Sequence, residues 1–117
     1  MTAMDAALQD IRKAGALAAA IVSRDGTVLE ADLPPGVSRE TFSIMCATIH
    51  GASMTVSAEL HRGKPRRIVI EVDAGRVMIL EAGRRALAVL VLTANTDPAT
   101  LADDLRPLME RVAREIG

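Results

Sequence analysis

The sequence predicts an α/β (α+β) three-layer sandwich in which three helices cover both faces of a five-stranded antiparallel sheet. Short apolar segments joined by tight turns indicate the strands. Residues 86–92 are apolar at every position, so this part of the sheet needs cover on both faces. Helical patterns at both ends and in the middle of the chain provide that cover, and the predicted order of elements is α-β-β-α-β-β-β-α.

The first predicted elements are a helix and a hairpin. Residues 1–13 carry apolar side chains at helical spacing and are followed by Gly15, which favours a helix end. The short apolar segment 16–23 could continue that helix, but Gly15 and the turn sequence "RDGT" favour a strand that ends in a hairpin. Residues 27–33 alternate between apolar and polar side chains, which is typical of a strand near the edge of a sheet.

A long helix and a meander of three strands follow. The sequence "PPG" breaks the second strand, and Ser38 is a favourable N-cap for a helix that runs to about residue 63. The three strands are expected at residues 67–72, 77–81 and 86–93. Asp97 and Pro98 begin a closing helix, and Pro107 predicts a kink or an offset start within it.

The long central helix is apolar on two opposite sides. The bulkier stripe, which we expect to face the sheet, comprises Phe42, Met45, Cys46, Ile49, Ala52, Val56 and Leu60. The opposite stripe comprises Ile44, Ala47, Gly51, Met54 and Ala58. The opposite stripe has the spacing of a coiled-coil seam. A glycine at its centre costs ~1 kcal/mol of helix stability against alanine. Close approach of another backbone would explain why a glycine is found there.

We expect this second stripe to pack against a second copy of the chain, as an antiparallel helix pair that crosses near Gly51 on a two-fold axis. The alternative is an exposed, alanine-rich face, since single exposed apolar residues are common. Ile44 and Met54 favour the dimer because both side chains are large.

Composition excludes several classes of protein. A net charge of −1 and a single aromatic residue, Phe42, argue against a nucleic-acid partner. Cys46 is the only cysteine, which fits a reducing cytoplasm. The N-terminal segment lacks the pattern of a signal peptide, and the apolar runs are shorter than the ~20 residues that span a bilayer. We therefore expect one cytoplasmic domain over residues 1–117, without membrane insertion.

No residue pattern predicts catalysis, a cofactor or a metal. His50 and His61 are eleven residues apart on the central helix, which separates them by ~16 Å along its axis. Ser23 and Asp25 have no neighbouring histidine and are better explained as hairpin-turn residues. A phosphate-binding glycine loop does not occur. We expect a protein that is not an enzyme.

A basic cluster follows the central helix and comprises His61, Arg62, Lys64, Arg66 and Arg67. Positive charge at a helix C-terminus complements the helix dipole, and charge on an edge strand discourages aggregation. The functional alternative is a docking surface for an acidic patch on a partner. Arg66 and Arg67 are the candidate residues for that surface.

The segment "GALAAAIVSRDGTVLEADLPPGVSRETFS", together with the order of elements, resembles the roadblock/dynein light chain family in its short prokaryotic form. The resemblance covers residues 3–116 and is most specific over 19–33, while longin and profilin-like folds share the general architecture. It implies a homodimer formed through the central helix and the third strand, whose edges join two sheets into one.

The resemblance also implies a function. Members of the family act as non-enzymatic adaptors and regulators of small Ras-like GTPases, or as light chains of motor complexes. We therefore expect a homodimeric adaptor or regulator of a small Ras-like GTPase. The alternative is a structural dimerisation or assembly module with no nucleotide-switch partner.

Overall fold

The structure is a computed structural model that describes residues 2–116. Its elements are α1 (Ala3–Lys13), β1 (Ala18–Ser23), β2 (Val28–Asp32), α2 (Arg39–Glu59), β3 (Ile68–Val72), β4 (Gly75–Ala82), β5 (Ala86–Leu92), α3 (Pro98–Asp104) and α4 (Arg106–Ile116). The predicted order is confirmed, and the closing helix is divided into α3 and α4. Pro107 lies in the first turn of α4, where a missing N–H is tolerated, so the second helix starts there instead of continuing the first.

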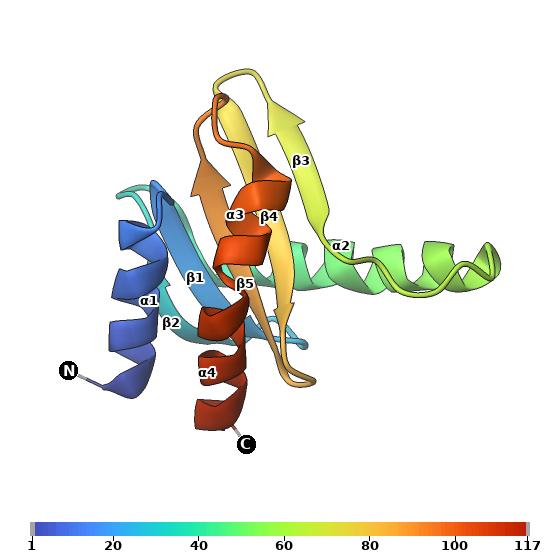
Figure 1. Cartoon of the computed structure of the whole chain (residues 1–117), viewed down its shortest axis with the longest axis horizontal. Coiled ribbons are helices and arrows are strands. Elements are labelled where there is room, and N and C mark those ends of the chain that lie inside the picture. The colour runs from blue at the N-terminus through green and yellow to red at the C-terminus, as the bar shows by residue number, and fades with distance from the viewer. Residues whose placement is uncertain (1, 117) are drawn as a thin grey trace.

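The five strands form one antiparallel sheet in the order β2-β1-β5-β4-β3 (Figure 1). The chain reaches this order because β1 pairs with both β2 and β5. The N-terminal hairpin thus joins the edge of the meander β3-β4-β5. Strands β1 and β5 lie in the interior of the sheet and are almost entirely buried, as their continuous apolar sequences predict. Strands β2 and β3 form the two edges.

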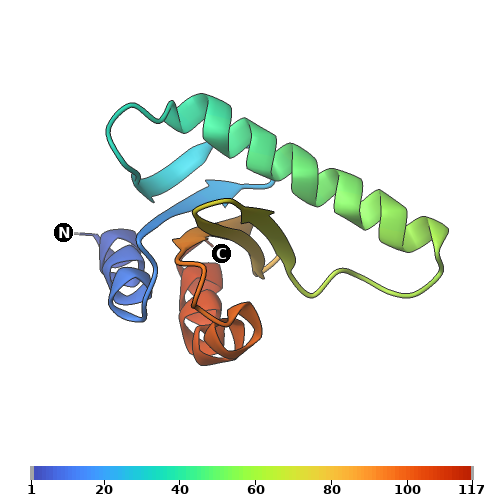
Figure 2. The ribbon, with the colours of Figure 1, turned by 90° about the horizontal axis from the view of Figure 1, so that it is seen from above.

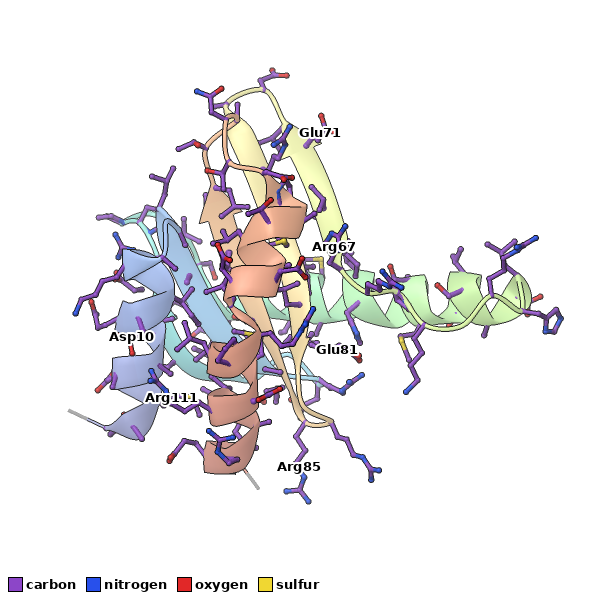
Figure 3. All side chains as sticks on the ribbon, viewed as in Figure 1. Asp10, Arg67, Glu71, Glu81, Arg85 and Arg111 are labelled. Carbon is purple, nitrogen blue, oxygen red and sulfur yellow. The ribbon has the colours of Figure 1, made fainter. Side chains whose placement is uncertain are left out.

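Helices cover both faces of the sheet. Figure 2 shows α2 on one face and the terminal helices on the other, so the predicted three-layer sandwich is confirmed. The larger core lies between the sheet and α1, α3 and α4, with Ile11, Met78, Leu90 and Leu105 among its fully buried side chains. The core beneath α2 is smaller. Two ion pairs hold α1 in place: Asp10 accepts a hydrogen bond from Arg111 of α4 at 2.6 Å (Figure 3), and Asp32 of β2 accepts one from Arg12.

The turn between β1 and β2 is stabilised by its own side chains. The Ser23 hydroxyl donates to the Asp25 carboxylate and accepts from the Thr27 amide at 3.0 Å. The Thr27 amide also donates to the Asp25 carboxylate at 3.1 Å. The hydrogen bonds that Asp25 accepts, first that from Ser23 and then those from Thr27, lower the pKa of this exposed carboxyl group. Gly26 lies in the left-handed region with φ +93°, and a Cβ there would be 2.8 Å from the Ile44 Cα atom. The turn therefore packs directly against the backbone of α2, and the interpretation of Ser23 and Asp25 as turn residues is confirmed.

The face of α2 that contacts the sheet differs from the predicted one. The buried residues of the helix are Ser43, Cys46, Ala47 and His50. Ala47, which was expected on the outward stripe, is only 8% exposed and belongs to the core beneath α2. Conversely, the bulky side chains expected on the sheet are exposed at three positions: Met45 (50%), Val56 (60%) and Leu60 (63%). The prediction of which stripe faces the sheet is wrong at these four positions and at Ala52, which is also exposed. It is confirmed for Phe42, Cys46 and Ile49, which pack in the core beneath α2.

The reason lies in the sheet beneath the helix. The residues of β1 and β2 below α2 include Ala20 and Ala31, and small side chains on both sides bring helix and sheet close together. The buried face of α2 also includes a histidine, His50, whose Nε2 atom lies 3.3 Å from a carboxylate oxygen of Glu81. Glu81 also pairs with the Arg24 guanidinium. Helical periodicity does not reveal this acidic neighbour on β4.

Candidate functional site

The second half of α2 has no core of its own. No residue from 51 to 59 is buried, although the helix continues for more than two turns beyond His50. Figures 1 and 2 show this half passing beyond the edge strand β3. It presents Val56 and, at its C-cap, Leu60, both more than half exposed. Isolated helical segments of this length are marginal in water, so packing from outside the chain is expected.

Two hydroxyl groups on the outward face of α2 are bonded to carbonyl groups of the helix itself. Thr48 donates its hydroxyl to the Ile44 carbonyl at 2.8 Å, and Thr55 donates to the Gly51 carbonyl at 3.3 Å. A Cβ atom at Gly51 would have nothing within 4 Å. The fold of the single chain therefore gives no packing reason for a glycine here, although glycine weakens a helix by ~1 kcal/mol against alanine.

The sheet beside this helix is also incompletely covered. In β3, Ile70 pairs with Val77 of β4, which in turn pairs with Val91 of β5, so these three side chains form a row across the sheet. All three are only half-buried, whereas in the next row Ile79 and Val89 are 1% and 0% exposed. Registered neighbours share a face, so the open row lies on the α2 side of the sheet, next to the region that α2 covers.

The outer edge of β3 has no strand beside it, because β3 is the last strand of the sheet. Val69 and Val72 are exposed there, at 37% and 53%. An apolar edge strand with free peptide groups is a template for pairing with another chain. Uncovered apolar surface thus occurs together on three adjacent parts of the molecule: the second half of α2, the open row of the sheet and the edge of β3.

The predicted interface residues are partly on this surface. Ile44 is 47% exposed, Gly51 and Ala58 are exposed, and Met54 is half-buried. Ala47 does not belong to it, because its side chain is in the core. Sequence reasoning missed Met45, Val56 and Leu60, which the helical wheel placed on the sheet because of their size. Their only sequence signal was that α2 has apolar residues on nearly every side.

The two predicted docking residues, Arg66 and Arg67, lie just before β3 and are exposed. Within residues 2–116 neither arginine makes an ion pair or a side-chain hydrogen bond. Arg67 lies close enough to the start of α3 to influence Asp97. The pKa of Asp97 is lowered mainly by the hydrogen bond from the Thr100 hydroxyl, at 2.6 Å, with a smaller contribution from Arg67.

Comparison with known proteins now identifies the family. The sequence profile of the Roadblock/LC7 domain matches residues 6–92, from α1 through β5. The chain belongs to the Roadblock/LC7 family. The resemblance found in the sequence is confirmed, and the matched part includes α2 and β3. Roadblock/LC7 domains are non-enzymatic regulators and light chains, so the chain is of the regulator or adaptor kind.

Relatives and solved structures agree with this assignment. Protein MJ1340 of Methanocaldococcus jannaschii is 29% identical over 114 residues, which cover 97% of this chain and 96% of that protein. The Roadblock/LC7 domain of Streptomyces avermitilis superimposes with a TM-score of 0.85 at 18% identity and 96% coverage of both chains. MglB in a tetrameric arrangement superimposes with a TM-score of 0.82 at 21% identity, over 96% of this chain and 85% of that one.

No helix in the part of the chain that the structure describes is both long enough and apolar enough to cross a bilayer.

Proposed function

We propose that this Roadblock/LC7 domain is a homodimeric, non-enzymatic adaptor or regulator of a small Ras-like GTPase. The observation that carries the proposal is the uncovered apolar surface shared by the second half of α2, the open row of the sheet and the edge of β3. Exposed apolar residues gathered on neighbouring elements are typical of an interface between proteins. A second copy of the same chain is the simplest protein that complements it.

A two-fold axis beside β3 would cover all three uncovered parts of this surface in one dimer. The free edges of two β3 strands pair antiparallel and join the two sheets into one. The half of α2 that passes beyond β3 then lies over the partner's sheet. Met54 lies four residues after the buried His50 and therefore on the same side of the helix. There it covers the half-buried Ile70 and Val77 of the other copy. Each helix thus completes the layer that its own chain leaves open.

The outward faces of the two α2 helices approach each other in this arrangement. Gly51 lies near the crossing point, where the absence of a side chain permits close approach of the two backbones. Ile44, Met54 and Ala58 remain in the proposed interface, and Ala47 is removed from it. The MglB structure with a tetrameric arrangement shows that a protein of the same fold self-associates, which supports the proposal.

The family supports a GTPase as the partner. Members of the Roadblock/LC7 family act as adaptors and regulators of small Ras-like GTPases or as light chains of motor complexes. An extended surface across two joined sheets offers a GTPase more area than one small sandwich. Arg66 and Arg67, exposed and without an ion pair among the described residues, are the proposed docking residues for acidic groups on the partner.

Calorimetric titration with Ras-like GTPases from the source organism tests this function. Each GTPase is loaded with GDP or with a non-hydrolysable GTP analogue, and we expect tighter binding of the GTP form. The double variant Met45→Glu/Val56→Glu should be monomeric, folded and unable to bind, because both positions are exposed on α2. Leu17→Glu is the matched control, since Leu17 is 54% exposed but lies outside α2 and β3.

Two outcomes contradict the proposal. Binding in neither nucleotide state would favour the alternative of a plain assembly module. Full binding by a monomeric Met45→Glu/Val56→Glu variant would show that the dimer does not create the docking surface.

A further inference from the structure

A cleft of about 480 Å³ lies at the edge of the sheet between the loop that leads into β3 and helices α3 and α4. Leu80 and Met109 line it with apolar side chains from the core on the α1, α3 and α4 side of the sheet. Three arginines, Arg66, Arg67 and Arg106, line its rim. The cleft therefore combines an apolar floor with a basic rim, on the face of the sheet opposite α2.

The charges around the cleft do not balance. Two carboxylates also line it, but both already have partners in the chain. Asp103 accepts a hydrogen bond from Arg106 at 3.0 Å, and Glu81 pairs with Arg24. Arg66 and Arg67 have no such partner among residues 2–116. Two positive charges remain available, and carboxylates are their natural complement because guanidinium groups bind them through paired hydrogen bonds.

The cleft also offers a free strand edge. Strand β3 begins at Ile68, opposite Ile79 of β4, while β4 continues to Ala82. Residues 80–82 therefore have β5 on one side and no strand on the other. An extended segment can hydrogen-bond to such an edge and place alternate side chains on either face of the sheet.

We infer that this cleft binds an extended, acidic segment of a partner protein. Its carboxylates reach the exposed Arg66 and Arg67 at the rim, and an apolar side chain on the face of the segment turned towards the cleft lies on Leu80 and Met109. The inference goes beyond the proposed function, because it holds whether or not the partner is a GTPase. The proposed dimer uses the α2 side of the sheet and the edge of β3 at residues 68–72, whereas Leu80 and Met109 at the floor of the cleft belong to the core on the other face.

Nuclear magnetic resonance titration of the ¹⁵N-labelled full chain tests the inference. The probe is an N-acetylated, C-amidated pentapeptide with alternating glutamate and valine, and its control replaces each glutamate with glutamine. We expect saturable shifts of backbone amides near residues 66–68, 80–82 and 102–106 with the acidic probe alone. The shifts should weaken as salt is raised, because exposed charges are screened.

Matched variants distinguish binding of the acidic probe in the cleft from its general attraction to positive charge on the protein. Arg66→Gln/Arg67→Gln should weaken probe binding by about tenfold, since two charge-assisted contacts are lost. Arg84→Gln/Arg85→Gln removes the same charge from the β4–β5 turn, which does not line the cleft. Figure 3 shows Arg85 beyond Glu81, on the side away from Arg67. All four positions are exposed, so both variants should keep the fold and its dispersed spectrum.

The Arg84→Gln/Arg85→Gln variant should bind the probe as the wild type does. Three results would overturn the inference: no saturable shifts with the acidic probe, equal losses in the two double variants, or shifts centred on α2. None of these results depends on a GTPase, so the test is independent of the proposed function.

Discussion

At the scale of single residues, Gly26 fixes the position of α2 on the sheet. It lies in the β1–β2 turn with φ +93°, and a Cβ atom would be 2.8 Å from the Ile44 Cα atom. We expect Gly26→Ala to lower the free energy of unfolding by ~1–3 kcal/mol, because the added methyl group forces helix and turn apart. Urea denaturation of wild type and variant measures the difference.

Gly36→Ala is the matched control for this prediction. Gly36 has a similar φ of +89°, but nothing lies within 4 Å of the position of its Cβ atom. Left-handed strain affects both variants, whereas the clash affects only Gly26→Ala. Equal losses in the two variants would mean that the turn does not pack against α2 as described.

At the scale of elements, the sequence predicted every strand but placed several side chains of α2 on the wrong side of the helix. The strands are bounded by turns, and their apolar runs are sufficient to place β1 and β5 in the interior. The buried face of α2 depends on partners far away in the sequence. The buried His50 lies 3.3 Å from Glu81 of β4, and Ala47 packs in a core that includes Ala20 of β1 and Ala31 of β2. Helical periodicity in the sequence reveals neither contact. The size of the side chains was therefore a misleading guide to which side of α2 faces the sheet.

The second half of α2 provides a prediction at the same scale. Gly51→Leu should leave the chain folded, because no atom within 4 Å opposes a side chain there, and should weaken self-association by about tenfold or more through overpacking of the helix crossing. Sedimentation velocity over a concentration series measures the dissociation constant. Gln9→Leu, on the exposed face of α1, adds a comparable side chain away from α2 and should not change it. Unchanged self-association of Gly51→Leu would remove Gly51 from the interface.

At the scale of the whole molecule, the account depends on a second copy of the chain. The fold leaves one helix half, one row of the sheet and one strand edge uncovered, and a two-fold axis beside β3 covers all three at once. The family and the order of elements were predictable from the sequence because turns and apolar runs are local. The uncovered surface became visible only once the position of α2 on the sheet was known.

Sedimentation equilibrium of the wild-type protein at micromolar concentration tests this central claim most directly. The account predicts a species of twice the chain mass of 12.4 kDa, which dissociates on dilution without loss of fold or is too stable to dissociate. A single species with the mass of one chain across the micromolar range would contradict it.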